Sequence, residues 1–347
     1  MSSGPVWSLN STLVSVELEG GVVGWGETCP LGATYAPAHA EGARAALNVL
    51  GPALIGSDAA NLRAVQGRMD AALNGHAYAK AALDIAVHDA LARTRGLPVF
   101  ALLGGALTDC VPAYFAISVG PPEEMAREAA ERAQEGYQRL QIKVGGRPIA
   151  EDIETVRRVW AALNPQVRLV LDANRALNPA DAITLSQSLR DIPVAIEQPC
   201  DTLAQLAQIR PRLAHPLYMD ESATDIATLV RASGQGLVDG FGLKLTRMGG
   251  LSGMQAARDI CEAAGLRHTC DDSWGGDIIA AACVHMASTV QPALLDGVWL
   301  AQPHINGHYD AQRGVRAVDG RISVPNEPGL GVSIDPEQFG PSIATFN

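Results

Sequence analysis

Five charged residues recur at nearly even intervals, each near the end of a short apolar run. In chain order they are Lys143, Asp172, Glu197, Asp220 and Lys244, separated by 29, 25, 23 and 24 residues. A charge within an apolar run needs a partner, because burying it alone is costly. Three successive carboxylates form an oxygen donor set that Mg²⁺ or Mn²⁺ prefers, with coordination positions left for water or substrate. Any single residue fits an ordinary strand-end ion pair, but the ordered set predicts a metal site flanked by two lysines.

Two lysines beside a metal-bound carboxylate suit proton transfer at one carbon. The proton α to a carboxylate is weakly acidic, and the charge left by its removal needs a cation as Lewis acid. A lysine base must be neutral at working pH, so its pKa is expected to fall from about 10.4 toward roughly 7 to 8. Lys143 and Lys244 are therefore the predicted bases, and Asp172, Glu197 and Asp220 the predicted ligands.

Eight short apolar runs, separated by helical stretches, would position these residues. The runs span 110–119, 139–145, 167–174, 193–199, 216–222, 240–246, 267–273 and 293–299. Between them, apolar residues recur three and four apart, as in amphipathic helices. This alternation predicts an α/β fold, a closed (β/α)8 TIM-type barrel, in place of an open sheet with a Gly-rich phosphate loop. Strands 2 and 6 of such a barrel are opposite, so the two lysines would face each other across its mouth.

The barrel is expected to span 109–310, between two other segments. Residues 1–108 predict an α+β capping domain, with a hairpin over 11–27 that turns at Gly20 and Gly21, and helices over 39–56 and 79–94. Residues 311–347 contain a further β-like run, "RISV", and are expected to return to the capping domain.

Composition excludes several classes of partner. Hydrophobic residues make up 47% of the 347, enough for a large core, and the net charge of −11 disfavours nucleic acid and anionic membranes. Neither a long apolar segment nor a secretory pattern is present, which predicts a cytoplasmic protein acting on a small molecule. The six cysteines lack Cys-x-x-Cys spacing, so we expect small buried side chains and no zinc site or disulfide framework.

The motifs around the five residues resemble those of the enolase superfamily, in its muconate-lactonizing subgroup, over nearly the whole chain. They are "IKVGG", "LDAN", "IEQP", "MDES" and "KLTRMGG". The resemblance implies a capping domain over a barrel, a magnesium ion and removal of a proton α to a carboxylate, in epimerases, racemases, cycloisomerases and dehydratases. It also implies a homo-oligomer.

Two features depart from this subgroup. Its usual lysine two residues before Lys143 is Gln141 here, which shares a strand face with Lys143 and is a neutral hydrogen-bonding group. Chains of the subgroup usually have a strand before the hairpin, so the first strand of the capping domain is expected to be missing from a sequence that begins "MSSGPVWSL".

The ends of strands 7 and 8 should meet the far end of the substrate. Asp271, Asp272 and Trp299 lie there and suit a cation. An indole face contributes about 2 kcal/mol or more to a desolvated quaternary ammonium, whereas paired carboxylates alone suit a primary or secondary amine equally well. In the alternative interpretation the tryptophan plugs the barrel, either aspartate caps a helix, and Gly275 and Gly276 begin an anion-binding helix, which two acids disfavour.

Three longer motifs narrow the resemblance to betaine epimerases that act on 4-hydroxyproline betaine and proline betaine. They are "RLQIKVGGRP", "CDDSWGGDIIAAAC" and "GVWLAQP", and they include Gln141. The resemblance implies that Trp299 packs on the ammonium and that Tyr35 reaches down from the capping domain; Tyr35 fits simple loop packing equally well. The expected enzyme is a Mg²⁺-dependent isomerase, a two-base 2-epimerase of an amino-acid betaine.

Other functions remain open. Dehydration of a hydroxyproline, or epimerisation of an N-acyl amino acid or dipeptide, would use the same scaffold. Cycloisomerisation of a dianionic muconate is disfavoured by repulsion from Asp271 and Asp272. A non-catalytic metal-binding barrel would be expected to have lost a ligand or a base, and all five residues are present.

Overall fold

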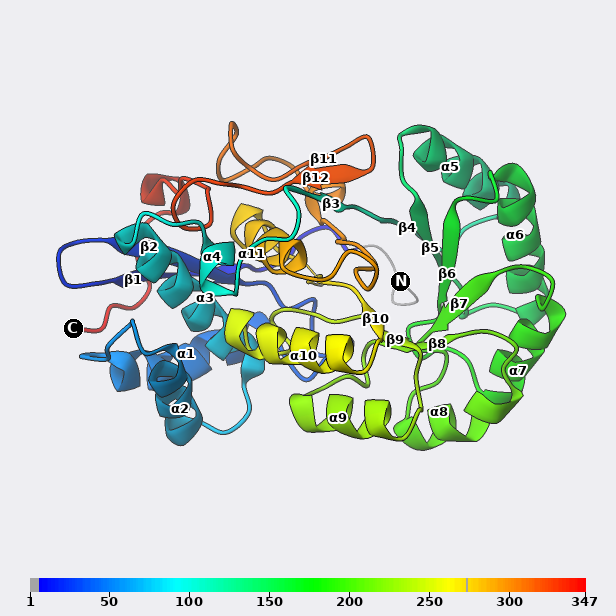
Figure 1. Ribbon diagram of the computed structural model, residues 1–347, viewed down its shortest axis with the longest axis horizontal. Helices are drawn as coiled ribbons and strands as arrows, with labels where there is room; N and C mark the ends of the chain where they lie inside the picture. Colours follow the sequence, from blue (N-terminus) through cyan, green and yellow to red (C-terminus); the bar gives the residue numbers. More distant parts are fainter. Residues whose placement is uncertain (1–5, 273) are drawn as a thin grey trace.

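A curled parallel sheet forms the barrel, in the right-hand half of the molecule in Figure 1. The computed structural model describes residues 6–272 and 274–347. The strands of this sheet, in hydrogen-bonding order, are β4 (Phe115–Ile117), β5 (Arg139–Lys143), β6 (Arg168–Asp172), β7 (Val194–Glu197), β8 (Leu217–Met219), β9 (Gly240–Phe241) and β10 (Arg267–His268). The eighth predicted run closes the ring through single bridges, from Leu295 to His268 and from Val298 to Ala113. The predicted barrel is confirmed.

Helices follow the strands along the chain and cover the outside of the sheet. They are α5 (Pro122–Gln134), α6 (Ile149–Ala162), α7 (Pro179–Ser188), α8 (Leu203–Ile209), α9 (Ile226–Gly234), α10 (Leu251–Ala263) and α11 (Asp277–Ser288), with short 3₁₀ turns η1 (Arg210–Arg212), η2 (Gln302–His304) and η3 (Pro336–Phe339). Local sequence sets their ends. Helix α5 starts with a proline and two glutamates in its first turn and ends before Gly136, whose φ of 93° suits glycine.

The capping domain packs a hairpin against helices. Its elements are β1 (Thr12–Glu17), β2 (Val23–Thr28), α1 (Ala40–Leu54), α2 (Leu62–Ala72), α3 (Ala77–Thr94) and α4 (Val99–Leu102). The hairpin turns at Gly20 and Gly21, both at positive φ, as predicted. Every residue from Tyr78 to Ala92 in α3 is buried. Gly24 and Gly26 of β2 allow this close packing, because a side chain at either position would clash with the backbone of α3.

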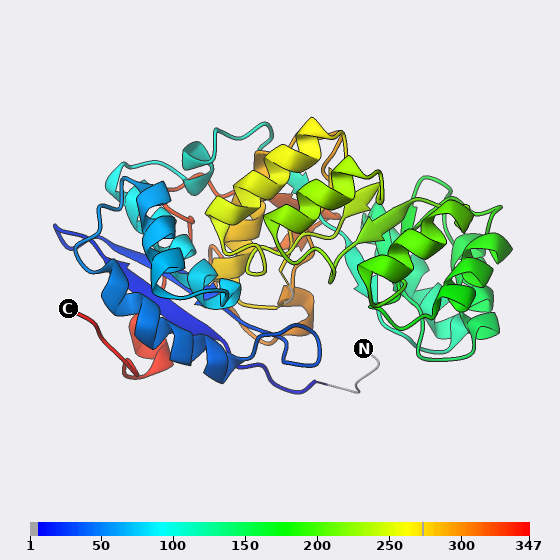
Figure 2. The ribbon, with the colours of Figure 1, turned by 90° about the horizontal axis from the view of Figure 1, so that it is seen from below.

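Two carboxylates of the capping domain bind the starts of barrel helices. Asp84 of α3 accepts hydrogen bonds from the backbone N–H and the hydroxyl of Ser252, at 3.0 and 2.6 Å, in the first turn of α10. Glu27 of β2 accepts from the N–H groups of Gly276 and Ile279, at 2.9 and 3.3 Å, at the start of α11. Helix starts carry unpaired N–H groups and partial positive charge. These contacts fix the capping domain, coloured blue in Figure 2, on the barrel.

The C-terminal segment contacts both parts of the molecule. Its strands β11 (Ala317–Val318) and β12 (Arg321–Ser323) form a sheet with β3 (Cys110–Pro112), at the start of the barrel. The strand expected to return to the capping domain pairs here instead, because β3 belongs to no barrel ladder and offers an open edge. The contact with the capping domain comes later, where the Leu330 N–H donates to Asp89 of α3 at 2.7 Å.

Among the described residues, none of the helices combines the length and the apolarity that crossing a bilayer requires.

Candidate active site

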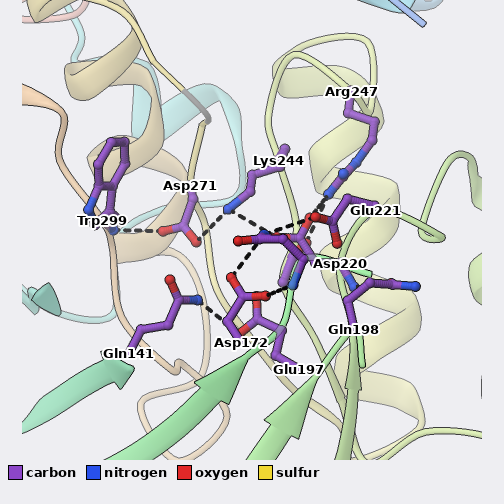
Figure 3. Close-up of polar contacts among 12 residues, drawn as sticks. Gln141, Asp172, Glu197, Gln198, Asp220, Glu221, Lys244, Arg247, Asp271 and Trp299 are labelled. Atoms are coloured by element: carbon purple, nitrogen blue, oxygen red, sulfur yellow. Dashed lines mark hydrogen bonds and ion pairs between the residues drawn. The ribbon is translucent and has the colours of Figure 1, made fainter. Parts of the chain in front are cut away.

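The five predicted residues meet at the carboxyl-terminal ends of the barrel strands, and Figure 3 labels four of them, Asp172, Glu197, Asp220 and Lys244. Lys143, Asp172 and Glu197 are the last residues of β5, β6 and β7 and are direct neighbours in register. Asp220 follows β8 immediately, and Lys244 lies three residues beyond β9. In the strand order, β5 and β9 occupy the second and sixth positions of the ring. The two lysines therefore approach the carboxylates from opposite sides.

Each lysine has its own carboxylate partners. The Lys143 ammonium lies 2.5 Å from Asp172 Oδ2 and 2.9 Å from the side-chain oxygen of Asn174. The Lys244 ammonium lies 3.5 Å from both Asp220 Oδ2 and Asp271 Oδ2. Figure 3 shows Lys244 between these two carboxylates.

The carboxylate partners set the direction of the pKa shift of each lysine. Burial alone would lower the pKa of Lys143, but the charge and hydrogen bond of Asp172 raise it above its usual value. Burial also opposes the charged form of Lys244, yet Asp220 leads the groups that raise its pKa well above the usual value. Both directions follow from ion pairs with the carboxylates that were assigned to the metal, so the decrease expected beside a bound metal stays a prediction.

The carboxylates of the site shift one another's pKa values, because they lie close together and are buried. Burial, and then Asp172 and Asp220, raise the pKa of Glu197 well above its usual range. Burial, followed by Asp220 and Asp172, raises the pKa of Glu221 to about 7. Asp220 behaves differently, because Lys244 and Arg247 overcome the effect of burial and lower its pKa to about 2.

These carboxylates fit a divalent cation by their chemistry. Within residues 6–272 and 274–347, no three Asp, Glu, His or Cys side chains already converge on one point. Each carboxylate instead accepts a hydrogen bond from a protein side chain. Asp172 accepts one from Lys143, and Asp220 accepts one from Arg247 at 2.5 Å. Glu197 accepts one from Gln141 Nε2 at 3.1 Å. The donors are all oxygen, lie on adjacent strand ends and repel one another, so a cation would relieve their repulsion.

Sequence analysis missed four polar residues around the ligands. Asn174 donates to Asp172 and to Glu221 Oε1, at 3.1 and 2.9 Å. The Gln198 side-chain oxygen accepts the backbone N–H of Asp220 at 3.0 Å. The four missed residues are Asn174, Gln198, Glu221 and Arg247. The first three lie one or two positions after a predicted ligand, and the last lies three positions after Lys244. The motifs "LDAN", "IEQP", "MDES" and "KLTRMGG" therefore already contained them.

The two adjacent aspartates face different surroundings. Asp271 is fully buried and accepts the Tyr114 hydroxyl at 2.7 Å on Oδ2 and the Trp299 backbone N–H at 2.6 Å on Oδ1. Asp272 accepts the backbone N–H of Thr246 at 2.8 Å. Asp271 therefore faces Lys244 and the site, whereas Asp272 supports the loop after β9.

The Trp299 indole belongs to an aromatic cluster beside the site. Its ring stacks on His304, with centroids 5.8 Å apart and an interplanar angle of 20°. Trp274 meets the same indole edge-on at 5.4 Å. The predicted substrate residue is thus held in a defined orientation by its neighbours.

Tyr35 approaches the carboxylates from the capping domain. Arg175, shortly after β6, donates to the Tyr35 carbonyl oxygen at 3.0 Å and holds this loop over the barrel. Burial, and then the charges of Asp220 and Glu221, raise the pKa of the phenol well above its usual value. The phenol therefore lies within electrostatic reach of the site.

The helix start after strand 7 already holds an anion. Gly276 at the start of α11 donates its N–H to Glu27, and Ile279 in the first turn does the same. The alternative of a substrate anion bound there is wrong, because a carboxylate of the protein occupies the position.

Two family descriptions match the chain. Residues 1–104 match the mandelate racemase / muconate lactonizing enzyme N-terminal domain, and residues 124–338 match the enolase C-terminal domain-like family. The chain belongs to the enolase superfamily. Within it, the chain falls in the group related to muconate-lactonizing enzymes and mandelate racemase.

Relatives extend over nearly the full length of the chain. A cis-3-hydroxy-L-proline dehydratase from Roseibium aggregatum is 38% identical over 97% of this chain and 92% of its own. An L-Ala-D/L-Glu epimerase from Bacillus subtilis is 30% identical, over 94% and 90%. A solved enolase superfamily member from Roseovarius nubinhibens, complexed with magnesium, has a TM-score of 0.94 at 36% identity and covers 99% of this chain and 95% of that one. This member of the superfamily is therefore an enzyme of its epimerase, dehydratase and cycloisomerase family.

Proposed function

We propose that this enzyme transfers a proton at the α-carbon of a proline-type carboxylate, and that its reaction is 2-epimerisation of an amino-acid betaine. The position of Lys143 and Lys244 on opposite sides of the carboxylates carries this proposal. One lysine removes the α-proton from its face of the substrate, and the other returns a proton to the opposite face. The configuration at C2 is thereby inverted.

Asp172, Glu197 and Asp220 would hold Mg²⁺, or alternatively Mn²⁺. A divalent cation held there supplies positive charge beside the substrate carboxylate, which makes the α-proton more acidic. The magnesium in the Roseovarius nubinhibens relative supports this assignment. The neutral Gln141 orients Glu197 through its hydrogen bond and adds no charge of its own.

The surroundings of Asp271 favour a quaternary nitrogen. Both of its oxygens already accept hydrogen bonds, from Tyr114 and from the Trp299 backbone. A quaternary ammonium is attracted by negative charge but donates no hydrogen bond. It can therefore be stabilised by a carboxylate whose oxygens already accept hydrogen bonds from the protein. The fixed positive charge of a betaine also acidifies the neighbouring α-proton, which suits a site with Gln141 where relatives of the subgroup have lysine.

Dehydration of cis-3-hydroxy-L-proline is the second candidate, and the Roseibium aggregatum relative favours it. In this substrate the hydroxyl lies on the same ring face as the carboxylate, opposite the α-proton. One lysine would take the α-proton while the other protonates the leaving hydroxyl; the C3–O bond breaks, water leaves, and the enamine tautomerises to a cyclic imine. A betaine cannot form this imine, so the two reactions require different nitrogens.

Proton NMR in D₂O with Mg²⁺ separates these reactions. L-proline betaine, trans-4-hydroxy-L-proline betaine and cis-3-hydroxy-L-proline would each be incubated with the enzyme, with L-Ala-L-Glu as a comparison. Loss of the α-proton signal with inversion at C2 of a betaine is the expected result. Imine formation from cis-3-hydroxy-L-proline without betaine exchange would favour the dehydratase, and exchange of the dipeptide alone would contradict both proline-type candidates.

A further inference from the structure

Tyr114 links the first strand of the barrel to the carboxylate beside Lys244. The residue precedes β4 and is 4% exposed. Its hydroxyl donates to Asp271 Oδ2 at 2.7 Å, the same oxygen that lies 3.5 Å from the Lys244 ammonium. In the proposed function this tyrosine only occupies an oxygen of Asp271, although that carboxylate is also the partner of a base.

A buried arginine holds the Tyr114 ring. The guanidinium of Arg139, at the start of β5, lies 3.8 Å from the ring centroid. Arg139 is 4% exposed, and within the described chain its three side-chain nitrogens make no hydrogen bond. Glu197 and Asp296 lie 3.6 and 3.7 Å from it and balance its charge. The arginine therefore contacts the ring face by cation–π attraction and fixes the direction of the hydroxyl.

Two donors hold Asp271 in a single orientation. The Trp299 backbone N–H occupies Oδ1, and the Tyr114 hydroxyl occupies Oδ2, which also faces Lys244. A fully buried carboxylate with one donor on each oxygen cannot rotate without breaking a charge-assisted hydrogen bond. Removal of the tyrosine hydroxyl would free Oδ2 to turn away from the ammonium.

We propose that Tyr114 is a positioning residue for one of the two lysines: it holds Asp271 against Lys244 and thereby controls proton transfer on the Lys244 face alone. Lys143 is held independently, by Asp172 and Asn174. The inference rests on the proposed transfer of an α-proton between two lysines, and it predicts that the two faces of the substrate respond differently to one substitution.

Face-resolved deuterium exchange tests this proposal. Lys143→Ala and Lys244→Ala would first assign each enantiomer of proline betaine to the lysine that removes its α-proton. Tyr114→Phe, which removes only the hydroxyl, should slow exchange on the Lys244 face by roughly tenfold to a hundredfold, the effect of a lost charge-assisted hydrogen bond, and leave the Lys143 face within about twofold. Tyr218→Phe is the matched control, because Tyr218 on β8 is equally buried and packs against Val170 and Ala195, whereas the hydrogen bonds to Asp271 come from Tyr114 and Trp299.

Equal slowing of both faces would show a merely structural role and overturn the proposal, as would unchanged exchange on the Lys244 face. If the wild-type enzyme exchanged neither enantiomer, the proposed function would fail, and a crystal structure of Tyr114→Phe would decide the positioning role by itself. Rotation of Asp271 away from Lys244 supports the role, and an unchanged Asp271–Lys244 distance contradicts it.

Discussion

Asp172 and Asp220 have two competing partners. Each contacts a lysine, and each is also a proposed metal ligand. Removing the metal should abolish activity, because the carboxylates then pair with the lysines and keep them protonated. Adding Mg²⁺ should restore activity. In a calorimetric titration, Glu197→Gln should weaken Mg²⁺ binding by at least about tenfold, because losing even a group that only supports a ligand costs roughly tenfold to a hundredfold. The control, Asp201→Asn, changes an exposed carboxylate and should leave affinity within about twofold; equal affinity in both variants would contradict the assignment.

Trp299 is predicted to set affinity for the substrate cation. Replacing the indole by leucine should raise KM for a betaine by roughly tenfold and leave kcat within about twofold, because the cation–π contribution is about 1 to 2 kcal/mol. Trp299→Phe keeps an aromatic face and should give a smaller increase. The check is steady-state kinetics of all three proteins with one betaine. An unchanged KM in the leucine variant would place the cation elsewhere.

The site residues at the ends of strands were predictable from the sequence, but the side-chain contacts between distant strands were not. The five charged residues, Asp271 and Gln141 were predictable because each follows or lies in an apolar run and shares a face with its neighbours. Tyr114 was not, because its contact with Asp271 joins residues 157 positions apart and depends on ring closure. The ion pairs of the two lysines with carboxylates were not predictable either, because they depend on distances that spacing does not give.

Helix α11 depends on a carboxylate from the other domain. Glu27 binds its first N–H groups and also accepts the Tyr309 hydroxyl at 2.8 Å. Glu27→Ala would leave these donors unpaired, so we expect the free energy of unfolding to fall by roughly 2 kcal/mol in urea titrations. Glu19→Ala, at an exposed position beside the hairpin turn, should change it by less than about 0.5 kcal/mol. Equal stability of the two variants would refute the capping role.

His285 in the same helix should make stability depend on pH. Burial lowers its pKa from 6.5 to about 4, and its Nδ1 accepts the Phe100 N–H at 3.4 Å. Below pH 6.5 the unfolded chain binds a proton that the folded chain does not, so stability falls as pH decreases toward 4. Between pH 7 and pH 5 the native protein should lose about 2 kcal/mol more than His285→Asn. Parallel pH profiles in denaturant titrations would show that the buried imidazole contributes nothing.

The elements followed the predicted pattern most closely where periodicity was strong. Helices α5 and α6 lie between the predicted strand runs, where apolar residues recur three and four apart. Strands β9 and β10 are only two residues long, although the apolar runs were longer; beyond them the two segments stay linked by a bridge between Lys244 and Asp271. The pairing of β12 with β3 was not predictable, since no local pattern specifies which open edge a short strand selects.

The whole molecule is a barrel with a fixed cap. Asp84 and Glu27 hold the capping domain on two helix starts, and Arg175 holds the loop that carries Tyr35. The sequence predicted this architecture through motif order and resemblance, whereas these contacts between domains join residues that have no relation in sequence. Substrate orientation between the two lysines is thus a property of both domains together.

The most direct test of the two-base account is α-proton exchange of each betaine enantiomer by the two single lysine variants in D₂O. The account predicts that neither variant epimerises, that Lys143→Ala exchanges one enantiomer only, and that Lys244→Ala exchanges only the other. Exchange of both enantiomers by one variant, together with complete loss in the other, would show a single base and contradict the account.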